Sequence, residues 1–398
     1  MSEIVYVKEI PSLRLHVKNN HGQITFDEEM YTLLLPHLHE DFKNKGDNYV
    51  AISCFPPFPY SADVEERICK HITENIKNSD TKIIFDNVYE GHTVSCINGI
   101  YYIIDKLNLN PSQCYFVSGG MQAEKFHKEY CFYKNIPKKL NIIVLNSWER
   151  HVQMTMTRHD LVKHFDFKIE NKQKLFLCFN RVLRAHRIAL LGLLYNKNLV
   201  DCSYYSFFQN LTHGSKESYI PYIDRGILSD ELYSIVVKNL ENNKEQFPLL
   251  LNNSDGSNTN GIYESDSELY KNSYFSLVTE TFFFGKNDYL SWEEKSVFFS
   301  EKIFKPIACK HPFIIVSKPL SLKYLRTIGY KTFHPFIDES YDLIENDEKR
   351  LLAIGDEIER LSKQTPEQWI EWLTNIKEIV DHNQKTLLYK SDFNYIER

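Results

Sequence analysis

The sequence predicts an α/β protein of two Rossmann-like domains that face one another across a cleft. Two observations carry this prediction. The chain of 398 residues is longer than one ordinary hydrophobic core supports. Apolar runs typical of strands also alternate with helical stretches, and this alternation is typical of parallel sheets. A single larger α/β domain with insertions is the alternative, and typical domain sizes favour two domains.

The first half of the chain contains four apolar runs that read as strands, separated by loops and helical stretches. Asp86, Glu90, His92, Gly119 and Gly120 follow or end two of these runs, so we expect them at the ligand crevice, which lies beyond the carboxyl ends of parallel strands. The runs are 48–59 (NYVAISCFPPFP), 81–91 (TKIIFDNVYEG), 113–120 (QCYFVSGG) and 140–149 (LNIIVLNSWE), with a helix expected over 95–109.

A polar stretch without a clean period, near residues 160–172, predicts the boundary between the domains. The pattern then restarts, and a capping box formed by Thr365, Pro366 and Gln368 opens a final helix. We therefore expect an N-terminal domain over 1–168, a C-terminal domain over 169–365, and a helix over 366–398 that packs back toward the first domain. The strands expected in the second half are 174–180, 274–281 and 311–317, and the helices are 181–199 and 318–330.

Composition narrows the class of protein. The formal net charge of −6 disfavours general nucleic-acid binding, which usually leaves a basic footprint. No segment approaches the roughly 18 apolar residues of a membrane span, and the N-terminus has no signal-peptide core, so we expect a soluble, cytoplasmic protein. The eight cysteines are scattered singly without a CxxC pair, which predicts buried, reduced thiols and no structural zinc.

A cluster of cationic residues follows the strand expected at 174–180. Arg181, Arg184, His186 and Arg187 fall in the first turns of the next helix, directly after Asn180. The N-terminus of a helix attracts anions, and guanidinium groups bind phosphate in a bidentate manner. The pattern therefore indicates an anion site, with Asn180, Arg181 and Arg187 as candidate ligands. Solvated surface arginines are the alternative.

The segment SEKIFKP, residues 300–306, places three charged residues at the start of an apolar run. With Ser300 as N-cap, Glu301 falls in the first turn of a short or kinked helix that contains Pro306. Lys302 and Lys305 are three residues apart and project from the exposed side. A carboxylate at a helix start can accept ribose hydroxyls while lysines meet phosphate charge. An ordinary Glu–Lys surface pair is the alternative.

Glu280 lies at the carboxyl end of the strand YFSLVTE. A carboxylate at this position points into the same crevice. A helix-capping acid is the alternative reading.

These segments together resemble the donor-binding half of GT-B glycosyltransferases, and most closely the fucosyltransferase type. The resemblance is carried by FSLVTET at 275–281 and FFSEKIFKPIACKHPFIIVS at 298–317, and it covers roughly residues 175–335. The family signature is an acidic strand end, a T/S-E-K-hydrophobic segment and a short apolar strand. Two departures put the donor sugar in question: Thr281 follows Glu280 where the family has Asn-Ser, and the Lys305-Pro306 pair differs.

The resemblance implies that the domain over 1–168 binds the acceptor and that the domain over 169–365 binds the nucleotide sugar. It also implies roles for four residues. Glu301 would hold the nucleotide ribose, Lys302 and Arg181 would hold the diphosphate, and Glu280 would face the sugar or ribose. Lys305 and Arg187 are further candidates for neutralising the diphosphate. The implied co-substrate is a nucleotide-diphosphate sugar, with a GDP-sugar slightly favoured, and the transferase would be of hexosyl or fucosyl type.

The implied reaction is inverting, metal-independent transfer to a hydroxyl acceptor, a glycan or small molecule. A metal-dependent transferase would need an Asp-x-Asp-type clamp, and ESDSE at 264–268 reads as solvated. The general base is expected from the first domain. Glu90, beside Gly91 and His92, is the candidate, and His92 could tune or share the proton; Asp86 and Asp63 are alternatives.

Three other classes of function remain as alternatives. The chain could be a non-catalytic nucleotide-sugar-binding module, or a phosphorylase or nucleotide-sugar epimerase on the same two-domain frame. A Rossmann dehydrogenase is disfavoured because the sequence has no GxGxxG, and a P-loop is absent. A DNA glucosyltransferase is a further alternative, which the net charge disfavours.

Overall fold

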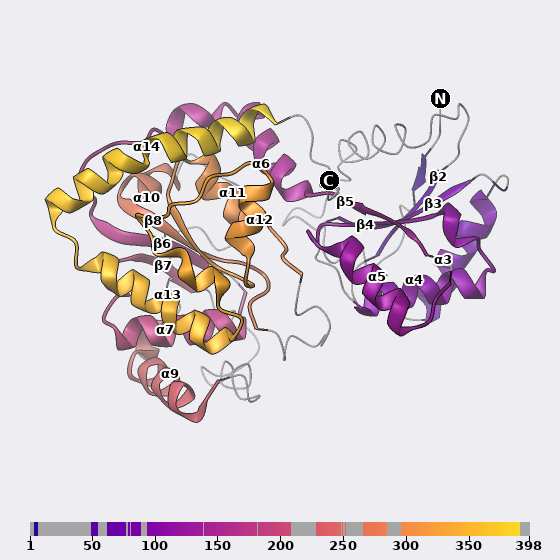
Figure 1. The fold of residues 1–398 in the computed structure, drawn as a ribbon, viewed down its shortest axis with the longest axis horizontal. Coiled ribbons are helices and arrows are strands. Elements are labelled where there is room, and N and C mark those ends of the chain that lie inside the picture. Colours follow the sequence, from indigo (N-terminus) through magenta and orange to yellow (C-terminus); the bar gives the residue numbers. More distant parts are fainter. Residues whose placement is uncertain are drawn as a thin grey trace. The chain divides into compact units, whose positions relative to one another are not determined.

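The computed structural model describes residues 4–6, 49–54, 62–76, 79, 81–88, 94–137, 139–180, 182–207, 228–247, 249, 251, 266–284 and 296–390. The chain divides into two compact units, one of Met1–Ser147 with Asp392–Arg398 and the other of Trp148–Ser391. Each unit contains one parallel sheet with helices packed on it (Figure 1). The predicted α/β class and parallel pairing are therefore confirmed.

The first unit has a five-stranded parallel sheet in the order β1-β2-β3-β4-β5. Each right-handed crossover steps in the same direction, so α3, α4 and α5 lie on one face of the sheet (Figure 1). Phe85 of β3 and Ile100 of α4 belong to the buried core between them. The strands are Ile4–Tyr6, Tyr49–Ser53, Lys82–Asn87, Cys114–Ser118 and Asn141–Val144, and the helices are Ala62–Asn75, Val94–Lys106 and Ala123–Tyr133.

The second unit has a four-stranded parallel sheet in the order β7-β6-β8-β9. From β6 the chain moves to β7 on one side, and β8 and β9 are then added on the other side. Strand order therefore reverses between β6 and β8, which creates a topological switch point at their carboxyl ends. The strands are Lys174–Asn180 (β6), Tyr204–Phe207 (β7), Ser273–Thr279 (β8) and Phe313–Val316 (β9).

Two groups of helices cover this second sheet (Figure 1). Helix α11 contacts β8 and packs with α14, while α7 packs with α9 and α13. A Cβ atom on Gly192 of α7 would lie 2.8 Å from Cα of Val236, so glycine permits the close α7–α9 approach. The helices are Ser147–Arg158 (α6), Ala185–Asn196 (α7), Asp230–Asn242 (α9), Ser267–Lys271 (α10), Glu301–Ala308 (α11), Ser321–Thr327 (α12), Asp347–Ser362 (α13) and Pro366–Tyr389 (α14).

The division between the units differs from the predicted boundary at residue 168. It falls between Ser147 and Trp148, near the start of α6, and α14 belongs to the second unit. The amide of Gln153 in α6 explains this, because it donates to the carbonyls of Leu387 (2.9 Å) and Leu388 (3.1 Å) at the end of α14. Helix α6, which the sequence reading did not identify, is thereby fixed to the second unit.

Two local predictions are confirmed. Thr365 and Gln368 form the capping box of α14, and Ser300 caps α11, whose eight residues include Pro306. All eight cysteines are unpaired thiols, seven of them buried, and Cys202 is partly exposed. Within the described ranges, none of the helices is both long enough and apolar enough to cross a bilayer.

Candidate functional site

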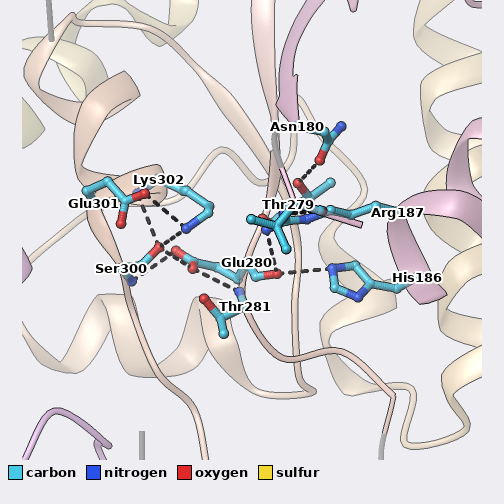
Figure 2. A network of polar contacts seen from close by, with 10 residues as sticks. Asn180, His186, Arg187, Thr279, Glu280, Thr281, Ser300, Glu301 and Lys302 are labelled. Atoms are coloured by element: carbon cyan, nitrogen blue, oxygen red, sulfur yellow. Dashed lines mark hydrogen bonds and ion pairs between the residues drawn. The ribbon is translucent and has the colours of Figure 1, made fainter. Parts of the chain in front are cut away.

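The candidate site lies at the switch point of the second sheet. Asn180 is the last residue of β6 and Thr279 is the last residue of β8. Glu280 follows β8 directly, and Ser300 with Glu301 begins α11. Figure 2 shows that these side chains converge in one polar network. Glu280 and the start of SEKIFKP are therefore in contact, and the ligand crevice expected there stays a prediction.

Glu280 is fully buried and joins β8 to α11. Its Oε1 accepts a hydrogen bond from the backbone N–H of Ser300 (3.2 Å), and its Oε2 accepts one from the Ser300 hydroxyl (2.6 Å) (Figure 2). Burial raises the pKa of Glu280, and nearby Lys302 partly opposes this shift. Glu280 therefore ties the end of β8 to the start of α11, and its predicted place beside a sugar or ribose stays a prediction.

Lys302 is a cation of the network that remains partly exposed to solvent. Its Nζ lies 3.1 Å from the Ser300 hydroxyl and 3.0 Å from Oε1 of Glu301. The Lys302 side chain is 27% exposed, whereas that of Glu301 is 6% exposed. An ammonium group held by two neighbours and still open to solvent can meet an incoming anion at low conformational cost.

Glu301 remains a carboxylate despite its burial. Burial alone would raise its pKa, but the positive charges of Lys302 and Lys305 outweigh that effect and lower the pKa of Glu301 overall. A buried, ionised carboxylate at a helix start can accept hydrogen bonds from a diol. Its charge is maintained by the same lysine that is available for phosphate.

Lys305 occupies a different position from Lys302. It lies in the last turn of α11, and burial lowers its pKa while Glu301 and Asp266 act in the opposite direction. Lys305, like Lys302, is only partly buried, and its predicted role at the diphosphate stays a prediction.

Asn180 and Arg187 support the backbone of the crevice. Arg187 is 2% exposed, and its guanidinium donates to the carbonyls of Val182 (2.9 Å) and Thr279 (3.0 Å). Burial, together with nearby Arg184, lowers the pKa of Arg187 to about 10. The amide oxygen of Asn180 accepts from the Thr279 hydroxyl (2.5 Å). Both side chains thus make hydrogen bonds within the fold, and their predicted roles as ligands stay predictions.

His186 also supports the crevice. Its Nε2 lies 3.0 Å from the carbonyl oxygen of Glu280, and its ring stacks on Phe283 at 5.5 Å between centroids. Burial lowers the pKa of His186 far below its usual value, so the ring is neutral. It fixes the turn that follows β8.

The remaining predicted residues fall into two groups. Glu90, His92 and Arg181 lie outside the described residues. Asp86 is the penultimate residue of β3, and its Oδ1 accepts from the backbone N–H of Val88 (3.1 Å). Within the described parts of the chain, no three His, Cys, Asp or Glu side chains are grouped so as to hold a metal ion.

Sequence reasoning missed two buried cations that hold the loops beyond the strand ends. Lys318 donates to the carbonyl of Phe284 (2.9 Å), and Arg350 donates to the carbonyls of Phe283 and Ser317 (both 3.1 Å). Lys318 follows HPFIIVS directly, so its place after a strand was a usable signal. Arg350 lies in α13, and nothing in the local sequence marks it.

We expect the pH dependence of unfolding to reveal the buried Glu280. Its pKa in the folded protein is raised above the ordinary 4.5, so its carboxyl group stabilises the fold below about pH 4.5, and this contribution is lost as pH rises through the raised pKa. Glu280→Gln cannot ionise. Its deficit relative to wild type, about 1 kcal/mol at pH 4, should therefore narrow by pH 7.5 in urea unfolding. A deficit that stays constant or widens would contradict this assignment.

Comparison with known proteins gives little further guidance. No protein-family model matches the chain, and no curated protein matches it. One similar solved structure, described as trehalose-6-phosphate from E. coli bound with UDP-2-fluoro glucose, is 10% identical with a TM-score of 0.37, over 92% of this chain and 78% of that one. A glycosyltransferase from Rickettsia africae is 12% identical with a TM-score of 0.31, over 87% and 91%. Similarity this low establishes neither the architecture nor the activity of this chain.

Proposed function

We propose that the protein is a glycosyltransferase that uses a nucleotide-diphosphate sugar. The observation that carries the proposal is the network of Glu280, Ser300, Glu301 and Lys302 at the switch point of a parallel sheet. It combines an ionised carboxylate suited to a ribose diol with an ammonium suited to a diphosphate. Ligands of α/β proteins bind at such switch points, and helix starts favour anions.

In this proposal the residues divide into ligands and supports. Glu301 accepts hydrogen bonds from the ribose hydroxyls, and Lys302 neutralises the diphosphate together with Arg181. Glu280 and His186 are positioning residues, because they act on the nucleotide through Ser300 and the turn after β8. Lys305 contributes through its charge.

The proposed reaction is an inverting displacement at the anomeric carbon. The acceptor oxygen forms a bond to that carbon, the bond to the nucleotide diphosphate breaks, and the acceptor proton passes to Glu90 with His92 beside it. Lys302 stabilises the charge that develops on the leaving diphosphate. We further propose a metal-independent reaction with a GDP-sugar as favoured donor and a glycan or small hydroxylated acceptor.

Two other functions fit the same network. A non-catalytic nucleotide-sugar-binding module would keep the roles of Glu301 and Lys302 but would lose nothing on replacement of Glu90. An epimerase would release a free sugar without any acceptor. Glycosyl transfer is favoured over both because the sequence resemblance includes the strand end, the S-E-K segment and the following strand together.

The donor site is tested by a thermal-shift screen against GDP, UDP, ADP, CMP and their sugars. A nucleotide at 100 times its dissociation constant stabilises the folded state by about 2.7 kcal/mol. We expect one nucleotide to raise the Tm of wild type and to leave Glu301→Ala unchanged. Glu378→Ala, which removes an exposed carboxylate from α14, should respond like wild type.

If no nucleotide raises the Tm, or if Glu301→Ala responds as wild type does, the donor site is not where we place it. Product analysis with the responding sugar nucleotide then separates the alternatives. Release of free sugar without an acceptor would favour the epimerase, and a stable complex without turnover would favour the binding module.

A further inference from the structure

A second candidate site lies at the opposite edge of the second sheet. A small cavity, partly open to solvent, is bounded by residues 165–168 and Lys172, by Ser273 and Tyr274, and by His311. Ser273 is the first residue of β8 and His311 precedes β9, whereas the donor network follows Thr279 at the other end of β8. The cavity is therefore separate from the proposed donor site.

The cavity wall carries an excess of positive charge. Its lining includes four lysines, Lys168, Lys172, Lys271 and Lys310, against one carboxylate, Asp166. Two of the lysines are matched by carboxylates outside the lining: Lys271 by Glu268 at 3.1 Å and Lys310 by Asp381 at 2.9 Å. Among the described residues, no carboxylate lies as close as this to Lys168 or Lys172.

Lys172 is the exceptional member of this lining. Its side chain is 6% exposed, yet the carboxylate paired with it, that of Glu170, lies 3.7 Å away and is itself largely exposed. This separation exceeds a hydrogen bond. Burying an ammonium group without close hydrogen-bonded pairing is costly, and burial accordingly lowers the pKa of Lys172. An anion in the cavity would offset that cost.

The part of the wall formed by His311 and Tyr274 is hydrogen-bonded or stacked within the fold and carries no charge. His311 Nδ1 is 2.7 Å from the hydroxyl of Ser276, and its Nε2 is 2.9 Å from the carbonyl of Ser273. Burial lowers the pKa of His311 to about 4, so it is neutral at physiological pH. Tyr274 stacks on Trp369 with ring centroids 3.9 Å apart. The positive charge that a ligand would meet therefore comes from the lysines.

We propose that this cavity binds a phosphoryl group, with Lys172 as the principal ligand and Lys168 as the second. Lysine is a common ligand of phosphate, and a doubly charged anion matches two ammonium groups of one cavity better than a single carboxylate does. The group is either inorganic phosphate or the phosphate of a small sugar monoester. It occupies a site that does not compete with the donor nucleotide.

The test is isothermal titration of the full chain with inorganic phosphate, and separately with glucose 6-phosphate, at constant ionic strength. Lys172→Met should bind the responding anion at least about tenfold more weakly than wild type, and Lys172→Arg should restore most of the affinity. Lys323→Met, which removes an exposed lysine from α12, should bind like wild type. Lys168→Met, also at an exposed position, should weaken binding about threefold.

The outcomes separate the sources of the ligand and the two sites. If only glucose 6-phosphate binds, the site is supported and its ligand is a phosphate monoester. If both anions bind, the site is supported and inorganic phosphate alone is sufficient for binding. If neither anion binds wild type, or if the Lys168 and Lys172 variants bind as wild type does, the proposal is overturned. Glu301→Ala should retain phosphate binding. A negative result for the proposed donor site would therefore leave the conclusion about this cavity unchanged.

Discussion

Arg350→Met should destabilise the second unit by about 3–5 kcal/mol. Arg350 is 1% exposed and donates to the carbonyls of Phe283, Ser317 and Ile344, and it is also paired with Asp347. Its guanidinium lies 4.4 Å from the centroid of the Phe283 ring. Methionine fills similar volume but leaves these buried acceptors without a donor, and each such loss costs about 1–3 kcal/mol.

Urea unfolding of the full chain measures the effect, with Arg326→Met as the matched control. Arg326 is 47% exposed and pairs with Glu339, so the same substitution there should cost less than about 1 kcal/mol. Since Phe283 and Ser317 follow β8 and β9, Arg350→Met should also weaken nucleotide binding. Equal stability losses for the two variants would show that Arg350 does not hold these loops.

Lys302→Met should weaken binding of the responding nucleotide diphosphate by about a hundredfold, or about 2.7 kcal/mol. The substitution removes the ammonium group proposed to meet the diphosphate. It also removes one of the two charges that keep Glu301 ionised, so a second ligand loses strength. The loss should fall as ionic strength rises, because a partly exposed charge is screened by salt.

Isothermal titration of wild type and variant with the nucleotide measures this loss. Lys349→Met, which neutralises an exposed lysine on α13, keeps the net charge of the protein equal to that of Lys302→Met. It should bind within about twofold of wild type. A nucleotide that binds Lys302→Met as tightly as Lys349→Met would remove Lys302 from the donor site.

The sequence alone was sufficient to predict the main strands of the second unit and the cap of α11. Apolar runs bounded by polar residues located β6, β8 and β9, and Ser300 was recognisable as a cap because it precedes an amphipathic stretch. Parallel pairing then required that Asn180 and Glu280 lie at the same edge. These inferences depend on local pattern and on one general rule of topology.

The roles of Asn180 and Arg187 could not be inferred in the same way. A side chain near a strand end can bind a ligand or form a hydrogen bond with the backbone. Which of the two occurs depends on which backbone carbonyls lack another hydrogen-bond partner in the folded chain. The carbonyl of Thr279 takes its hydrogen bond from Arg187, more than ninety residues earlier in the sequence. Helix α6, which the sequence reading missed, is likewise held by a distant contact, because Gln153 donates to the carbonyl of Leu387.

The reactivity of the buried thiols can be used to follow the unfolding of this protein. Five cysteines lie in the first unit and are buried, while Cys178, Cys202 and Cys309 lie in the second. Burial raises the pKa of all three in the second unit, so few thiolates are present to react with maleimide in the native state. Pulsed alkylation followed by peptide mapping can therefore time the opening of each unit separately without an introduced label.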